Sequence, residues 1–334
     1  MLKQTIIVLT ALIPATAGAQ SNDPVFISNV PQMVESLPDP VELPSAAVDL
    51  SDSSTQSKIT FESHPDAQAA QRLLKLQSAA ALVIDQEDGR LLYAKNTDAV
   101  MPIASITKLM TAIVVLDSGL PLDEAITIEA ADVDTLKGTR SRLKLGLTLT
   151  RGELLKLALM ASENRAAAAL ARAYPGGTQA FVHAMNQRAQ ELGMLDTRFL
   201  DASGLNPGNV STAHDLALMV NAGYQYPVIR EFTTSSSHRM ALLGRRYHRV
   251  VAFRNSNGLV HNGSWDIGLS KTGYISEAGR CLVMQAKIAS KPVIIVLLDS
   301  WGKLTRIADA NRIKRWMEGL ELGTPTLAGH KARM

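Results

Sequence analysis

Segments that favour β-strands lie near both ends of this chain, with a helix-rich stretch between them, and this order restricts the folds open to it. The runs "AALVIDQ" and "RLLYAKN" flank Glu87-Asp88-Gly89, a pattern typical of a β-hairpin. Near the other end, "GLSKTGYIS", "RCLVMQAKI" and "KPVIIVLLDS" are short, apolar or β-branched, and separated by turn residues. Antiparallel pairing of the early with the late strands would give a single sheet.

The middle region, about 121–226, is predicted to be helical. Thr150 and Glu153 form a capping box before "LLKLALM", and Pro175-Gly176-Gly177 ends the run "RAAAALARAY". An apolar helix, "SITKLMTAIVVLDSGL", precedes this region, and an amphipathic helix, "LTRIADANRIKRWMEGL", closes the chain. We therefore predict an α/β domain: an antiparallel sheet flanked by the N- and C-terminal helices, with an inserted all-helical lobe and a cleft between lobe and sheet.

The N-terminus is typical of a secretory signal peptide. Lys3 precedes a short apolar run and Ala17-Gly18-Ala19, so we predict residues 1–19 as a signal peptide cleaved after Ala19. The apolar run is well short of the ~20 residues that span a bilayer, and no later segment is a better candidate for a membrane anchor.

Three further segments follow from composition and pattern. Residues 20–63 are rich in Pro, Ser and Asp without periodicity and are predicted to be a disordered leader. Residues 64–322 are predicted to form the domain, with its lobe at about 121–226, and residues 323–334 a flexible tail.

Composition and charge exclude several functions. The formal net charge is only +3 and no basic run with aromatics stands out, so nucleic acid is a poor partner. The one cysteine, Cys281, has no disulfide partner in the chain and is expected to be a small buried hydrophobe. The seven histidines lack ligand spacing, and Walker A, dinucleotide-binding, H-E-x-x-H and G-x-S-x-G patterns are absent. We predict neither a metal nor a cofactor.

The pattern S-x-x-K occurs three times, beginning at Ser105, Ser141 and Ser300, whereas roughly one copy is expected by chance. Only Ser105 opens a long apolar helix, where its hydroxyl and the Lys108 amine, one turn later, share a face. Alone, Ser105 would more often be a helix cap.

Two other motifs occur once each and follow in order. Ser162-Glu163-Asn164 is the only S-x-N and is expected on a turn between helices, and Lys271-Thr272-Gly273 is the only K-T-G and is expected on a strand. Each alone would have an ordinary structural explanation, a turn or a solvated strand edge. The ordered set S-x-x-K, S-x-N, K-T-G favours a catalytic interpretation.

The residue types suit acyl transfer. Ser105 must lose a proton to attack a carbonyl carbon, and Lys108 can accept it only as a neutral amine, a form favoured by burial and by Lys271 as a second cation. Ser162 could pass the proton to the leaving amine, and Asn164 could hold a substrate amide.

The third motif and two backbone groups suit substrate binding. Lys271 and Thr272 offer a charge and a hydroxyl to a substrate carboxylate, and Gly273 would let the strand edge lie close to a bound peptide. The backbone N–H groups of Ser105 and Tyr274 are the expected oxyanion hole.

These motifs resemble those of the penicillin-binding serine peptidases, specifically the low-molecular-mass D,D-peptidases. The strings "PIASITKLMTAIVVLD", "LALMASENRAAAALARAYPGG", "STAHDLA" and "WDIGLSKTGYISEAGRCLVM" are similar to the periplasmic D-alanyl-D-alanine endopeptidases, the type-7 penicillin-binding proteins. The resemblance implies a β-lactamase/transpeptidase-like fold, Ser105 as nucleophile and Lys108 as proton acceptor. Ser162 and Asn164 would form the second motif and Lys271 would bind substrate. It also implies peptidoglycan peptides as substrates, β-lactams as covalent inhibitors, and a periplasmic location.

Alternatives remain open at this point. Endopeptidases cut D-alanyl–meso-diaminopimelate cross-links and carboxypeptidases trim terminal D-alanine, and the three motifs do not separate them. The flanking strings, and the absence of a further domain after the closing helix, favour an endopeptidase. A class A β-lactamase would need an E-x-x-L-N glutamate, which is absent, and an inactive peptidoglycan-binding module is disfavoured by the intact motifs. His214 stands where the resemblance leads us to expect arginine.

Overall fold

The computed structural model describes residues 74–244 and 247–322. The predicted signal peptide, leader and tail lie outside these residues. The elements follow one another along the chain as β1 (Ala80–Asp85), β2 (Leu91–Lys95), β3 (Met101–Pro102), η1 (Ala104–Thr107), α2 (Lys108–Asp117), β4 (Ala125–Thr127), η2 (Ala130–Asp132), β5 (Thr148–Thr150), α3 (Arg151–Met160), α4 (Asn164–Arg172), α5 (Gly177–Glu191), β6 (Val210–Ser211), α6 (Ala213–Tyr224), α7 (Pro227–Thr234), β7 (Ser237–Gly244), β8 (Tyr247–Arg254), η3 (Gly258–His261), β9 (Asp266–Ile275), β10 (Gly279–Ile288), β11 (Lys291–Ser300) and α8 (Thr305–Leu322).

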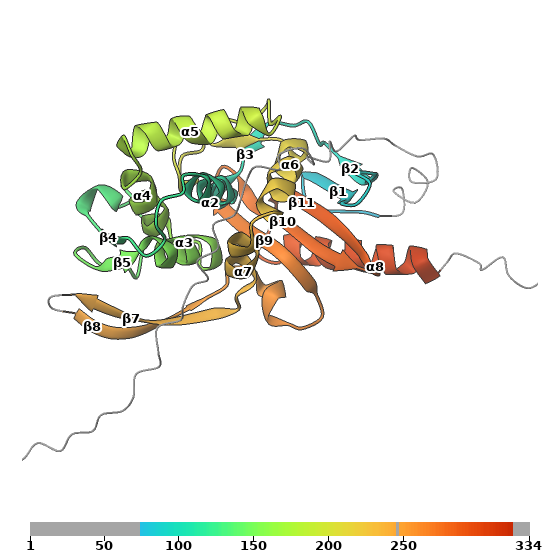
Figure 1. The fold of residues 1–334 in the computed structure, drawn as a ribbon. Coiled ribbons are helices and arrows are strands. Elements are labelled where there is room, and N and C mark those ends of the chain that lie inside the picture. The colour runs from blue at the N-terminus through green and yellow to red at the C-terminus, as the bar shows by residue number, and fades with distance from the viewer. Residues whose placement is uncertain (1–73, 245–246, 323–334) are drawn as a thin grey trace, which may run out of the picture. The chain divides into compact units, whose positions relative to one another are not determined.

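A five-stranded antiparallel sheet joins the two ends of the described chain, in the order β2-β1-β11-β10-β9 (Figure 1). The early hairpin pairs with the last strand in a continuous register from Ala80 opposite Leu298 to Asp85 opposite Val293. The predicted pairing of early with late strands is therefore confirmed. Strand β9, which carries the K-T-G motif, forms one edge of the sheet.

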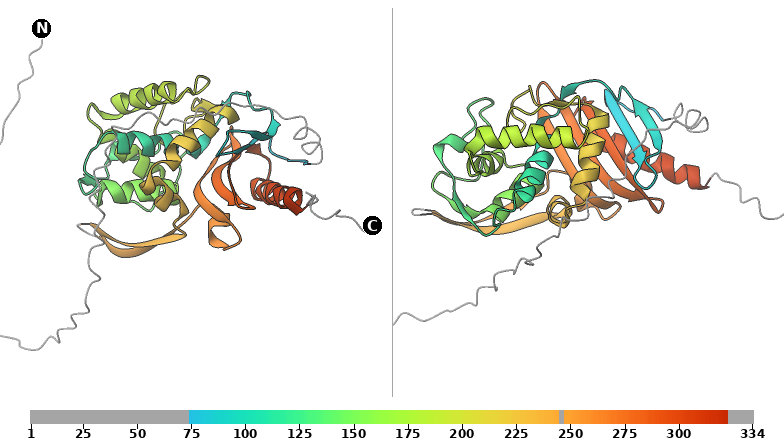
Figure 2. Two further views of the ribbon diagram at one scale, coloured as in Figure 1. Left: turned by 45° about the vertical axis from the view of Figure 1, so that its right-hand side comes forward. Right: turned by 45° about the horizontal axis from the view of Figure 1, so that its top comes forward.

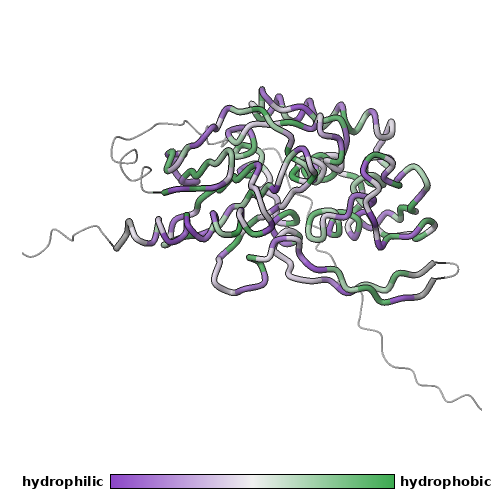
Figure 3. Tube along the Cα trace, turned by 180° about the vertical axis from the view of Figure 1, so that it is seen from behind, coloured by the Kyte–Doolittle hydropathy of each residue, from purple (hydrophilic) through white to green (hydrophobic). Residues whose placement is uncertain are grey.

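Both faces of this sheet are buried, which explains why its central strands are almost continuously apolar. Because side chains alternate along a strand, Val296 and its even-numbered neighbours join the core shared with the lobe, whereas Ile295 and Leu297 join the core beneath α8. Figure 2 shows the sheet between α8 on one side and the other helices on the opposite side. In Figure 3 the central strands contain hydrophobic stretches, whereas α8 contains many hydrophilic residues.

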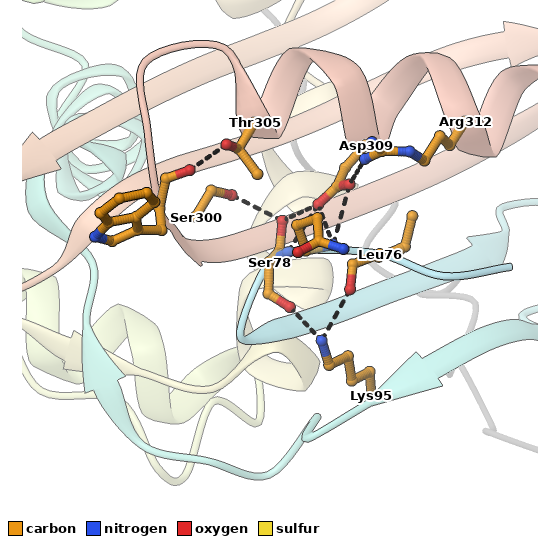
Figure 4. A network of polar contacts seen from close by, with 9 residues as sticks. Leu76, Ser78, Lys95, Ser300, Thr305, Asp309 and Arg312 are labelled. Carbon is orange, nitrogen blue, oxygen red and sulfur yellow. Dashed lines mark hydrogen bonds and ion pairs between the residues drawn. The ribbon is translucent and has the colours of Figure 1, made fainter.

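A buried carboxylate fixes α8 to the start of the sheet (Figure 4). Asp309 is fully buried and accepts hydrogen bonds from the backbone N–H of Gln77 (3.0 Å) and from the N–H (2.8 Å) and hydroxyl (2.7 Å) of Ser78. The Ser78 hydroxyl also lies 2.7 Å from that of Ser300, at the end of β11. One side chain thus ties the closing helix to the segment before β1.

Helix α2 lies inside the lobe instead of covering the sheet. The sequence led us to expect it over the sheet, but α6 contacts β1, β10 and β11 there, and α2 contacts α3, α4, α5 and α6. The physical reason is that α2 is apolar on nearly all of its faces, so it is most stable when it is surrounded by other elements. Every residue from Lys108 to Val115 is buried. The lobe is otherwise helical as predicted, with the short pair β4–β5 added at its edge.

The hairpin β7–β8 extends away from the body of the molecule (Figures 1 and 2). No sequence prediction covers it. Its inner face carries Met240, Leu242, Val251 and Phe253, which join the lobe-side core. Across the described ranges, no helix is both long enough and apolar enough to cross a bilayer.

Candidate active site

Ser105 lies on a short 3-10 turn, η1, that leads directly into α2. Ala104 just before it has φ +48°, a left-handed conformation that is costly for a residue with a Cβ. The turn places the Ser105 hydroxyl oxygen 2.9 Å from the Lys108 Nζ, as the S-x-x-K spacing predicts.

The Lys108 amine is fully buried among three oxygen atoms. Besides the Ser105 hydroxyl, Nζ lies 2.6 Å from the Asn164 side-chain oxygen and 2.6 Å from the Ser203 carbonyl oxygen. A neutral amine has two N–H groups and one lone pair. Asn164 and Ser203 can accept its two hydrogens, which leaves the lone pair for the Ser105 hydroxyl proton.

Burial makes this neutral form accessible. It lowers the pKa of Lys108 to about 7, against the opposing influence of Asp201 and Glu163, which raise it. A lysine with this pKa is available as a base near neutral pH.

The S-x-N motif lies on the predicted turn, between the end of α3 and the start of α4. Ser162 adopts φ +58°, and its hydroxyl accepts a hydrogen bond from Lys271 Nζ at 2.8 Å. Burial lowers the pKa of Lys271 well below its usual value, and the charges of Lys108 and Arg306 lower it further. The second and third motifs are thus in direct contact.

Asn164 is held at both ends of its amide. Its oxygen accepts from Lys108, and its nitrogen donates to the Thr139 hydroxyl at 3.1 Å. Thr139 in turn donates its hydroxyl and its backbone N–H to Asp134, both at 2.7 Å. To hold a substrate amide, as the sequence suggests, Asn164 would have to exchange one of these partners.

Two glycines let the chain close around the turn that carries Ser105. A Cβ on Gly273 would lie 2.8 Å from the Ile103 carbonyl oxygen and 3.2 Å from the Ser105 nitrogen. Gly204, with φ +80°, faces the same turn, and a Cβ there would overlap the Ala104 carbonyl. Gly273 therefore allows β9 to lie close to the Ser105 turn. The sequence predicted a different role, in which this glycine lets the strand edge approach a bound peptide.

The remaining residues of the third motif lie beside this turn. The Thr272 hydroxyl donates to that of Ser256 at 2.7 Å, which joins β9 to the segment after β8. The Tyr274 ring is exposed and lies under the Arg280 guanidinium, 4.4 Å from it.

Sequence reasoning missed two parts of the site. Asp201 accepts from the backbone N–H of Ser203 and of Gly204, each at 2.6 Å, and so aims the Ser203 carbonyl at Lys108. The string "DASGLN" indicates a turn but not this contact, because a backbone carbonyl leaves no signature in side-chain patterns.

The second missed part is Arg306, in the first turn of α8. Its Nε and Nη1 are buried without a hydrogen-bond partner among the described residues, and burial followed by the charge of Arg280 lowers its pKa. Burial raises the pKa of the neighbouring Cys281 thiol to about 11, in keeping with the predicted buried hydrophobe. Nowhere in the described ranges do three or more His, Cys, Asp or Glu side chains gather as metal ligands would.

Comparison with known proteins identifies the family. Residues 66–302 match the family described as D-alanyl-D-alanine carboxypeptidase. The chain belongs to this family. The D-alanyl-D-alanine endopeptidase of Pseudomonas aeruginosa is 50% identical over 244 residues, which is 73% of this chain and 78% of that protein. The D-alanyl-D-alanine endopeptidase of Escherichia coli is 45% identical over the same shares of the two chains.

Solved structures agree with this membership of the D-alanyl-D-alanine carboxypeptidase family. The crystal structure of the Streptomyces K15 DD-transpeptidase matches with a TM-score of 0.69 and 29% identity, over 73% of this chain and 98% of that one. The predicted family, α/β transpeptidase-like fold and enzyme class, a serine-type D-Ala-D-Ala peptidase, are thereby confirmed.

Proposed function

We propose that this protein is a periplasmic D-alanyl-D-alanine endopeptidase that cleaves D-alanyl–meso-diaminopimelate cross-links of peptidoglycan through an acyl-enzyme on Ser105. One observation carries the catalytic assignment: the Ser105 hydroxyl lies 2.9 Å from a buried Lys108 amine whose other neighbours are both acceptors. Endopeptidases at 45–50% identity support the choice of bond. The predicted signal peptide supports the location.

In acylation, Lys108 takes the proton of Ser105 as its oxygen bonds to the carbonyl carbon of D-alanine. The backbone N–H groups of Ser105 and Tyr274 would stabilise the resulting oxyanion, a contribution typically worth about 10²–10³ in rate per donor. The C–N bond then breaks, and the leaving amine receives a proton through Ser162, which Lys271 contacts at 2.8 Å. Water adds to the ester, the C–O bond breaks, and Ser105 regains its proton.

The leaving group carries a carboxylate on its D-centre, and three groups are suited to bind it. We assign this task to the Lys271 amine and the Thr272 hydroxyl, with Arg306, whose Nε and Nη1 have no partner among the described residues, as a third contact. Asn164 is assigned to substrate binding as well as to its present contact with Lys108. No step calls for a cofactor.

A carboxypeptidase that trims terminal D-alanine is the second candidate, because the matching family is described by that activity. The experiment that separates the two digests purified cross-linked muropeptide dimers and pentapeptide monomers with the protein and identifies products by mass spectrometry. An endopeptidase converts dimers to monomers and leaves pentapeptides largely intact. Loss of D-alanine from pentapeptides without dimer cleavage would assign the protein to the carboxypeptidases instead.

A further inference from the structure

The hairpin β7–β8 and its flanks carry an unbalanced positive charge. Between Glu231 and Asp266 the sequence contains five arginines and neither aspartate, glutamate nor lysine, although basic and acidic residues nearly balance over the whole chain at 34 to 31. Such segregation creates a local positive field around the hairpin, which cannot be seen from the small net charge of the whole chain.

The register of the hairpin separates a packed face from a charged one. Arg239 lies opposite Ala252, and Arg254 lies opposite Ser237, so these arginines are neighbours on the same face. Both are exposed, whereas Met240 and Phe253, on the other face, are buried against the lobe. Arg249, towards the tip, is also exposed, but it lies opposite Leu242 and so belongs by register to the other face. We call Arg239 and Arg254 the basic hairpin surface.

A loop of the lobe brings a further arginine to the hairpin, on its packed face. Arg142 donates to the Ala252 carbonyl at 3.0 Å and lies 4.2 Å above the Phe253 ring, so its guanidinium rests on the hairpin. Its acidic partner, Glu163, is buried and also accepts from Ser141, so it offers little negative charge to solvent.

The hairpin is continuous with the catalytic residues. Just after β8, the Ser256 N–H donates to the Met160 carbonyl at 2.9 Å, beside the S-x-N turn, and the Ser256 hydroxyl accepts from Thr272. From this root two eight-residue strands extend about 26 Å, at ~3.3 Å per residue. Figure 3 shows both hydrophilic and hydrophobic stretches along them.

We propose that the basic hairpin surface binds the carboxylates of peptidoglycan stem peptides and so holds the polymeric substrate beside Ser105. The inference rests on the proposed function, and charge complementarity carries it. Peptide stems repeat along the polymer and bear free carboxylates, so a positively charged surface beside the catalytic residues would contact stems next to the one being cleaved. A small soluble substrate would reach Ser105 without contacting the basic hairpin surface.

The test is co-sedimentation with insoluble, purified sacculi, in a Ser105→Ala background that prevents digestion. For Arg239→Glu/Arg254→Glu we expect the dissociation constant to rise about tenfold at low salt, and the difference to shrink as salt screens the charges. The Arg239→Lys/Arg254→Lys pair keeps the charge and should bind normally. The matched control, Lys287→Glu/Lys291→Glu, reverses two exposed lysines at the β10–β11 turn and should change binding less than about twofold.

Acylation by penicillin, measured with Ser105 present, checks that the reversed variant is folded and should stay within about twofold of the wild-type rate. Unchanged sacculus binding by a variant that acylates normally would overturn the proposal. A second outcome would also overturn it. If the wild type binds anionic phospholipid vesicles, and charge reversal abolishes this binding but leaves sacculus binding intact, the surface is a membrane contact. Failure of the proposed function is separate: the wild type would not be acylated, whatever its affinity for sacculi.

Discussion

Lys108 is the residue whose environment decides whether this site can act. Its amine contacts the Ser105 hydroxyl, the side-chain oxygen of Asn164 at the start of α4, and the Ser203 carbonyl, which Asp201 holds in place. Burial lowers its pKa, and the two acceptors orient its hydrogens away from the Ser105 hydroxyl. This geometry explains how a lysine can be a base without a histidine beside the serine.

The pH dependence of acylation should report Lys108. Its lowered pKa of about 7 means that the amine is protonated, and unable to accept a proton, below that pH. We expect the second-order rate of penicillin acylation to fall about tenfold per pH unit below pH 7 and to level off above it. Lys108→Arg, which stays charged, should not be acylated at any pH in this range. A wild-type rate that is flat from pH 5 to 8 would contradict the role of Lys108.

Thr139 should position Asn164 through their hydrogen bond. Thr139→Val preserves shape but removes both the acceptor for Asn164 and the donor to Asp134, so we expect acylation to slow about tenfold. Thr139→Ser restores the hydroxyl and should return the rate to within about twofold of wild type. If Val and Ser slow acylation equally, the hydroxyl has no positioning role.

At the scale of elements, the site depends on how closely three backbone segments approach one another. The Ser105 turn, strand β9 at Gly273 and the loop at Gly204 meet where a Cβ on either glycine would collide with backbone. Such contacts cannot relax by side-chain rotation, so they set the positions of Ser105 and of the oxyanion donors expected there.

Gly204→Ala should therefore impair both stability and acylation. The new Cβ would overlap the Ala104 carbonyl and would stand at φ +80°, so we expect a loss of about 3 kcal/mol or more of unfolding free energy. The matched control is Gly193→Ala, at φ +76° with open space around it, which should cost only about 1–2 kcal/mol and leave acylation unchanged. Denaturant unfolding and penicillin acylation measure the two effects, and equal losses for both variants would refute the contact argument.

Some elements and contacts could be predicted from the sequence and others could not. The early hairpin, the late strands, the capping box at Thr150 and the turn at Ser162 follow local rules and were predictable. The β7–β8 hairpin was not, because four apolar residues in a row from Met240 interrupt the two-residue alternation and its inner face is set by packing on the lobe. The order of the motifs predicted the contacts of Ser105, Lys108, Ser162 and Lys271. Asp201, Thr139 and Arg306 escaped, since their contributions depend on tertiary approach alone.

The part of the molecule that the structure describes is built around the sheet, with α8 on one face and the lobe on the other. The residues that we propose to be catalytic come from η1, α2, the α3–α4 turn and β9, so their geometry depends on the contact between the lobe and the sheet. The Asp309 network secures α8 on the opposite face of the sheet (Figure 4).

Asp309→Ala should destabilise the protein as a whole. It leaves the backbone N–H groups of Gln77 and Ser78 without their buried acceptor, and we expect a loss of about 3 kcal/mol in unfolding free energy. The control is Glu318→Ala, on the same helix, where a partly exposed pairing with Lys314 is worth less than about 0.5 kcal/mol. If the two substitutions cost the same in denaturant unfolding, the network does not anchor α8.

Ser105 is the residue that we propose to form the covalent acyl-enzyme. The decisive experiment treats the purified protein and its Ser105→Ala variant with benzylpenicillin, followed by mass spectrometry of the intact proteins and of their peptides. The predicted result is one adduct on the wild type, located on the peptide that bears Ser105, and no adduct on the variant. The adduct should persist, because no E-x-x-L-N glutamate is present to activate a deacylating water. An unmodified wild type, or an adduct that still forms on Ser105→Ala, would show that Ser105 is not the nucleophile.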